Sequence, residues 1–208
     1  AQTVTVTAVN DFIAEGGHSS TISHVATSAD GDYEAIDIDD VVATITDNDT
    51  AGITVSTISA STTEAGVTST FTVVLGSEPT GTVVIPLSSS DSTEGSISTS
   101  SLTFNPGNWD TVRTVVVTGV DDDIDDGTVG YTINLTSTSS TDPNYHNINP
   151  TDVSVENMDN DTVGVTITQS DGSTDVTEGG ATDTYTLVLA TQPTFDVTVE
   201  ITADSQST

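Results

Sequence analysis

Apolar and polar side chains alternate along most of this chain with a period of two residues. Residues 83–87 and 131–135, for example, carry apolar side chains at every second position. This is the period of a half-buried β-strand, because successive side chains of a strand point to opposite faces of the sheet. Turn-forming stretches such as 77–81 and 105–107 separate the alternating runs. The pattern predicts an all-β chain of seven-stranded antiparallel sandwiches, and no stretch has a convincing helical period.

The pattern also recurs along the chain. Four pairs of segments match at offsets of 111 to 114 residues: 4–11 with 115–122, 30–33 with 142–145, 47–55 with 159–167, and 63–75 with 177–189. A fixed period indicates tandem copies of one structural unit. The predicted units are the C-terminal half of a repeat at 1–50, a complete repeat at 51–162 and the N-terminal half of a further repeat at 163–208.

The two partial repeats complement each other in sequence. Residue 208 corresponds to about position 94 of the complete repeat and residue 1 to about position 112, so together they lack fewer than twenty residues of a whole unit. Two interpretations stay open. Identical subunits complete the unit head to tail, or the chain is a window of a longer polypeptide with neighbouring repeats.

The net negative charge of the chain excludes some classes of binding partner. The sequence has 32 Asp and Glu residues against a single basic residue, Arg113, which gives a formal net charge of -31. Binding to phosphate requires Lys and Arg, so nucleic acids and anionic membrane surfaces are excluded as partners. No run of 18 apolar residues and no signal-peptide pattern is present, so we expect no membrane insertion in this segment.

The same charge must be neutralised for the chain to fold. No Cys is present to form a disulfide. Acidic residues instead collect at the ends of predicted strands, at Glu64, at Asp91, in 121–126, and at Asp159 and Asp161. Loops of a sandwich alternate between its two ends, so these loops are expected to meet at one tip, where carboxylates favour a hard cation such as Ca2+. Clustered Asp is also typical of solvated turns, and that alternative stays open.

The order of these motifs resembles a Calx-beta domain. It runs from Glu-Ala-Gly at 64–66 through Leu-Thr-Phe-Asn-Pro-Gly at 102–107 and three Asp at 121–123 to a terminal Asp-Asn-Asp at 159–161. This family is known from sodium–calcium exchangers and large bacterial surface proteins. The resemblance implies tandem immunoglobulin-like (Calx-beta-type) antiparallel β-sandwiches, one whole and two partial, that bind Ca2+ at one tip.

Carried over position by position, the resemblance implies a set of calcium ligands in each copy. They are Glu64, Asp91, Asp121, Asp122, Asp123, Asp126, Asp159 and Asp161 in the complete repeat, Asp11, Glu15, Asp47 and Asp49 in the first, and Glu178 and Asp204 in the third. The chain departs from the family pattern at 125–127, where it has Asp-Asp-Gly. In the first copy Asn10 and Phe12 flank the Asp, which predicts weaker binding or none there.

No enzyme motif is recognisable. The sequence has no Gly-x-Ser-x-Gly elbow, no Cys nucleophile and no phosphate-binding Gly-rich loop, and its three His residues do not recur between copies. Paired carboxylates that recur with the repeat indicate a structural duty. Trp109 is expected to cap the sandwich edge, and an ion pair from Arg113 to a neighbouring carboxylate would contribute little.

These observations favour a non-enzymatic, calcium-stiffened rod or fibre segment of a bacterial extracellular or cell-surface protein. Its expected partners are calcium and neighbouring repeats or identical subunits arranged head to tail. Two alternatives stay open. One is a ligand-binding adhesin module for carbohydrate or protein, which clustered exposed aromatics would favour, although aromatics are only 4% of residues. The other is a non-catalytic spacer in a secreted hydrolase.

Overall fold

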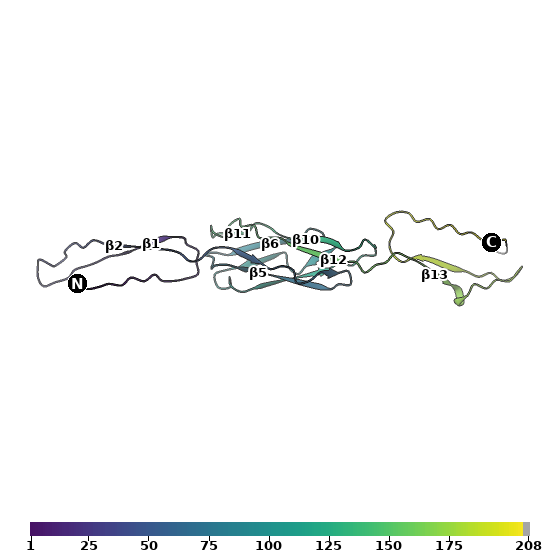
Figure 1. Cartoon of the computed structure of the whole chain (residues 1–208), viewed down its shortest axis with the longest axis horizontal. Helices are drawn as coiled ribbons and strands as arrows, with labels where there is room; N and C mark the ends of the chain where they lie inside the picture. The colour runs from purple at the N-terminus through teal and green to yellow at the C-terminus, as the bar shows by residue number, and fades with distance from the viewer. Residues whose placement is uncertain (206–208) are drawn as a thin grey trace.

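The computed structural model describes residues 1–205, which form three parts arranged along one long axis (Figure 1). We call them the N-terminal part (1–50), the central domain (51–162) and the C-terminal part (163–205). Strands are the regular elements of all three, and the one helical element in the described range is a three-residue turn, η1 (Ser170–Gly172). No described helix has the length and apolar character needed to cross a membrane.

Two sheets make up the central domain. One has the strand order β3-β5-β9-β7, and the other has the order β11-β6-β10-β12-β4 with β8 beside β6. The strands are β3 (Ile53–Val55), β4 (Thr62–Thr63), β5 (Thr68–Leu75), β6 (Val83–Ser89), β7 (Gly95–Ile97), β8 (Ser101–Phe104), β9 (Arg113–Gly119), β10 (Val129–Leu135), β11 (Ser139–Ser140) and β12 (Val153–Met158).

The predicted alternation appears directly in the burial of these strands. Every second residue of β5, β9 and β10 is buried, and Phe71, Val115 and Ile133 are at most 1% exposed. The inward side chains of both sheets form one core cluster. The all-β prediction is therefore confirmed, and the central domain is a two-layer β-sandwich.

Two details differ from the sequence prediction. Ten strands, rather than seven, lie between residues 53 and 158, and β4 pairs with β12 in parallel. The chain leaves β3, which pairs with β5, and crosses to the other sheet as β4, so the expected first strand is divided between the sheets. The pattern also missed β11, because a two-residue strand is too short to show a period.

The flanking parts each contain one hairpin with the register of the central domain. In the N-terminal part, β1 (His18–Ile22) pairs with β2 (Val41–Ile45) as β10 pairs with β12. In the C-terminal part, β13 (Val165–Gln169) pairs with β14 (Tyr185–Leu189) as β3 pairs with β5. In each flanking part, the repeated sequence therefore specifies the same local pairing as the equivalent segment of the central domain.

Candidate metal centre

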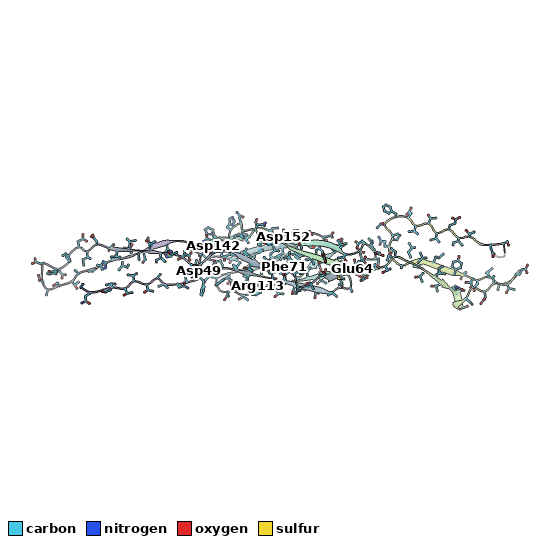
Figure 2. The ribbon with its side chains drawn as sticks, viewed as in Figure 1. Asp49, Glu64, Phe71, Arg113, Asp142 and Asp152 are labelled. Atoms are coloured by element: carbon cyan, nitrogen blue, oxygen red, sulfur yellow. The ribbon has the colours of Figure 1, made fainter. Side chains whose placement is uncertain are left out.

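One acidic group lies at the tip of the central domain that faces the C-terminal part. Glu64 directly follows β4, while Asp159 and Asp161 directly follow β12, so the parallel pairing of these strands brings the three carboxylates together. Each offers an oxygen within 4.8 Å of the others. Figure 2 shows Glu64 at this end of the domain, and its side chain is only 3% exposed.

A second acidic group lies at the same tip and includes a residue that sequence reasoning missed. Glu94 precedes β7, and its carboxylate lies with those of Asp122 and Asp126, again within 4.8 Å. Glu94 is 6% exposed, and the Asn157 side-chain amide donates to its Oε2 at 3.3 Å. The only available signal was its place three residues after Asp91, since Glu94 lies outside every motif of the repeat.

Asp159 organises the loops around the first group. Its Oδ2 accepts a hydrogen bond from the Gly127 backbone at 2.7 Å, and its Oδ1 accepts one from the Asp161 backbone at 2.6 Å. Asn160 ties the same loop to two other carboxylates. Its backbone N–H donates to Glu64 at 3.0 Å, and its side-chain amide donates to Asp121 at 3.0 Å. The loop of residues 121–127 is thereby fixed to the end of β12.

Burial and mutual repulsion govern the electrostatics of the tip. Burial, followed by the charges of Asp159 and Asp122, raises the pKa of Glu64. Burial, followed by the charges of Asp126, Asp91 and Asp122, likewise raises the pKa of Glu94. Backbone hydrogen bonds from Asp161 and Gly127 lower the pKa of Asp159. The charged Asp159 carboxylate therefore lies within 4.8 Å of Glu64 and Asp161, whose pKa values burial raises, and an added cation would relieve the repulsion among them.

The donor set fits a hard divalent cation. The sole basic side chain, Arg113, does not reach these carboxylates but lies with its guanidinium 5.7 Å from the centre of the Phe104 ring. The Asp161 Oδ2 atom is buried without a hydrogen-bond partner among the described residues. Buried carboxylate oxygens with no counter-ion from the protein are the ligands that calcium accepts.

The remaining predicted ligands of the complete repeat lie at the same tip but outside the two groups. Asp91 accepts hydrogen bonds from the backbone and hydroxyl of Thr93, and these bonds lower its pKa. The Asp121 carboxylate accepts a hydrogen bond from the Asn160 side-chain amide, as described above. The contact of Asp123 is made by its backbone carbonyl, which accepts a hydrogen bond from the Gln192 N–H.

The N-terminal part repeats the scaffold of the tip without a buried Glu. Asp47 accepts the Gly16 N–H at 2.6 Å and the Asp49 N–H at 2.9 Å, as Asp159 does with Gly127 and Asp161. The other two predicted ligands of the first copy, Asp11 and Glu15, line the same depression as Asp47 and Asp49. None of these residues belongs to the acidic groups found among residues 1–205, and neither do Glu178 and Asp204 of the third copy.

Both junctions between parts have the same backbone contact. The Gln192 N–H donates to the Asp123 carbonyl at 2.6 Å, and the Glu78 N–H donates to the Phe12 carbonyl at 2.7 Å. Gln192 and Glu78 are equivalent in the repeat, and so are Asp123 and Phe12. At the second junction, the Val163 N–H also donates to the Asp125 carboxylate at 2.7 Å.

Trp109 has a second contact besides the one that the sequence suggested. It packs on the core, as expected for a sandwich edge, but its ring also lies 5.8 Å from that of Phe12 in the preceding part. The residue is therefore half-buried at the first junction rather than only a cap of its own domain. A contact across 97 residues of sequence has no local signal.

No family model and no curated protein matches this chain. Among solved structures, it is similar to SSP-19, an MSP-domain protein like family member in Caenorhabditis elegans, with 17% identity, 48% of this chain and 92% of that chain covered, and a TM-score of 0.32. Domains 1–6 of the surface layer protein SbsC match with 18% identity, covering 72% of this chain and 24% of that chain, at a TM-score of 0.32. The S-layer protein rSbsC matches with 19% identity, 72% and 23% coverage and the same TM-score. The chain thus spans about a quarter of SbsC, and likenesses this distant define neither its fold nor its function.

Proposed function

We propose that this chain is a non-enzymatic structural segment of an extracellular repeat protein, in which calcium at the domain tip stiffens the junction to the next domain. In this proposal the repeats are immunoglobulin-like sandwiches of the Calx-beta type, exposed at a bacterial cell surface as a rod or fibre. One observation carries the proposal. The loop of residues 121–126 supplies carboxylates to the acidic tip and also contacts the C-terminal part.

The chain's own residues account for the coupling. Glu64, Asp159 and Asp161 would hold one cation, and Glu94, Asp122 and Asp126 would hold a second. A bound cation neutralises the repulsion that otherwise drives the loop of residues 121–126 away from the end of β12. The same loop carries the Asp123 carbonyl that accepts the Gln192 N–H, so ordering the tip also orders the junction. Extracellular calcium modules bind in the range of about 10⁻⁴ to 10⁻³ M, and we expect an affinity of that order here.

Thermal unfolding of the full 208-residue chain tests the tip sites. We expect about 10 mM calcium, roughly a hundred times a Kd of about 10⁻⁴ M, to raise the midpoint of the central domain by about 10 °C over chelator, since saturation at that level contributes about 2.7 kcal/mol. Magnesium should have a much smaller effect, because it demands a rigid octahedral site. Coinciding curves in calcium and chelator would contradict the proposal.

Matched variants locate the effect. Glu64→Gln and Glu94→Gln remove one charge each from the two acidic groups and should abolish most of the calcium-dependent shift. Asp110→Asn removes the same charge from an exposed position next to Trp109 and should leave the shift unchanged. Small-angle scattering then checks stiffening, because calcium should narrow the distribution of end-to-end distances. A raised midpoint with unchanged scattering would support the site and refute the stiffening.

A further inference from the structure

We propose that the two flanking parts are complementary binding surfaces, and that residues 163–205 of one copy pair with residues 1–50 of a second copy to form another sandwich of the central type. The inference goes beyond the calcium function, since it concerns strand pairing and core packing. The central domain is the template, because it holds both halves of the repeat in one chain.

The unpaired segments of the flanking parts are the first observation. In the central domain, the two halves of the repeat are joined chiefly by the pairs β5–β9 and β6–β10. Residues 2–8 correspond to β9, and residues 197–203 correspond to β6. Neither segment is part of a strand in this chain, whereas the hairpins whose pairing stays within one half are formed. The missing partner of each segment lies in the opposite half.

Exposed apolar side chains are the second observation. Val4 is 77% exposed, and its equivalent Val115 is fully buried. Tyr185 is 42% exposed, and its equivalent Phe71 is 1% exposed. The same contrast holds along both unpaired segments, for Val6, Val197, Val199 and Ile201 against Val117, Val83, Ile85 and Leu87. An apolar face of this extent marks a binding surface, and its spacing is that of a sandwich core.

Buried hydrogen bonds between the two halves of the repeat are the third observation. In the central domain, the buried Tyr145 hydroxyl donates to the Ser77 carbonyl at 2.8 Å and accepts from the Ser77 N–H at 2.9 Å. The adjacent Asp142 accepts the Thr80 N–H at 2.8 Å. These contacts join the two halves of the repeat. The N-terminal part has the equivalent Asp30 and Tyr33, and Tyr33 is 62% exposed.

The C-terminal part has residues equivalent to the hydrogen-bond partners of Tyr145 and Asp142. Thr191 is equivalent to Ser77, and Thr194 is equivalent to Thr80. The central pairings Phe71↔Val115 and Ile133↔Ser89 then translate into Tyr185↔Val4 and Ile22↔Ala203 between copies. Strands β7 and β8 are edge strands in the central domain, so the pairing of the two flanking parts does not depend on their equivalents. The composite sandwich therefore keeps its inner strands.

Three features affect the strength of this pairing. Neither flanking part has a Lys or Arg, so charge repulsion opposes association until salt or a divalent cation screens it. Glu178 would also take the place of Glu64 beside Asp47 and Asp49 of the neighbouring copy, a point that rests on the proposed function. Ala8 stands where the central domain has Gly119, at which an added Cβ would overlap the Thr63 carbonyl. Ala8→Gly should therefore tighten the association.

Cysteine trapping tests the register, since the chain has no Cys of its own. Two full-length single-Cys chains are mixed, one with Thr5→Cys and one with Thr184→Cys, which correspond to the paired Val116 and Thr70. We expect a mixed disulfide on mild oxidation. The matched control replaces Thr184→Cys by Thr186→Cys, which lies on the same face but diagonally, at about 7–8 Å rather than 4.5–5.5 Å. Equal trapping of both pairs would overturn the inference.

Sedimentation of the unmutated chain and of two variants tests the interface. Association should rise with concentration in millimolar calcium, and in chelator at high salt. Tyr33→Ala should weaken it by about tenfold or more, since it removes a side chain that pairing buries. Val25→Ala is the control, because Val25 is 87% exposed and corresponds to the exposed residues 136–137 of the central domain.

The outcomes separate this inference from the calcium proposal. If the chain stays monomeric at every concentration while calcium still raises its unfolding midpoint, the inference is wrong and the calcium site stands. The completing strands would then belong to a flanking repeat of a longer polypeptide. If specific trapping occurs but calcium leaves unfolding unchanged, the pairing stands and the calcium proposal fails.

Discussion

The central domain and the N-terminal part have equivalent hairpins in the same register but differ in burial. In the central domain, Val153 of β12 is 4% exposed, whereas its equivalent Val41 of β2 is 50% exposed. The backbone pairing of β1 with β2 nevertheless matches that of β10 with β12 residue for residue. The difference shows that local sequence specifies the hairpin, while the second layer of the sandwich comes from the other half of the repeat.

The largest expected effect is on the free energy of unfolding, and it should differ between the core of the central domain and the equivalent position of the C-terminal part. Phe71→Ala should destabilise the central domain by about 3–5 kcal/mol, because it opens a cavity in a filled core. Tyr185→Ala, at the equivalent position of the C-terminal part, should change the same transition by less than about 0.5 kcal/mol. Urea unfolding followed by the fluorescence of Trp109, at dilute concentration in chelator, measures both. Similar losses for the two variants would show that the parts unfold as one unit.

A smaller effect concerns pH, and it depends on the buried Glu residues that only the central tip has. Burial raises the pKa of Glu64 and of Glu94, so without calcium the folded state keeps these protons at a pH where the unfolded chain has lost them. Stability in chelator should therefore fall as the pH rises from the ordinary Glu value of about 4.3 through the raised pKa values.

The lowered pKa values of Asp91 and Asp159 act in the opposite direction, because their stabilisation is lost as the pH falls below the ordinary Asp value of about 3.9. Thermal midpoints between pH 3 and pH 8 in chelator check both limbs. Glu64→Gln combined with Glu94→Gln should reduce the limb above about pH 4.3 and leave the acid limb in place, while Asp126 and Asp161, whose pKa values burial also raises, keep a smaller part of the upper limb. An unchanged upper limb in the double variant would refute the assignment.

The smallest effect concerns the single basic residue. Arg113 lies over the Phe104 ring, and the first copy has Gln2 at the equivalent position. Arg113→Gln should cost about 0.5–1 kcal/mol, the usual range for a cation–π contact. The urea transition of the central domain measures the loss, with Arg113→Lys as the control that keeps a cation. If the Gln and Lys variants were equally destabilised, shape rather than charge would explain the contact.

Much of the fold was predictable from the sequence, because a period of two residues leaves few alternatives to an all-β sandwich, and a repeat of about 112 residues predicts the matching hairpins of the flanking parts. The meeting of Glu64 with Asp159 and Asp161 at one tip also agrees with the sequence expectation. Glu94 was missed because its burial follows from the position of β7 against β9, a tertiary pairing. The crossing of the chain from β3 to β4 leaves no periodic signal either.

The position of Arg113 in β9 has a further consequence for how the chain meets proteases. An enzyme that cleaves only after Lys or Arg has one peptide bond to attack in the whole sequence, the one between Arg113 and Thr114. That bond lies in a strand whose residues pair with Val73 and Thr72 of β5, so the folded sheet withholds it from a protease groove. The rate at which a trypsin-type protease cuts the chain into two fragments would therefore report how often the central sandwich opens. Both flanking parts contain no such bond and remain uncut.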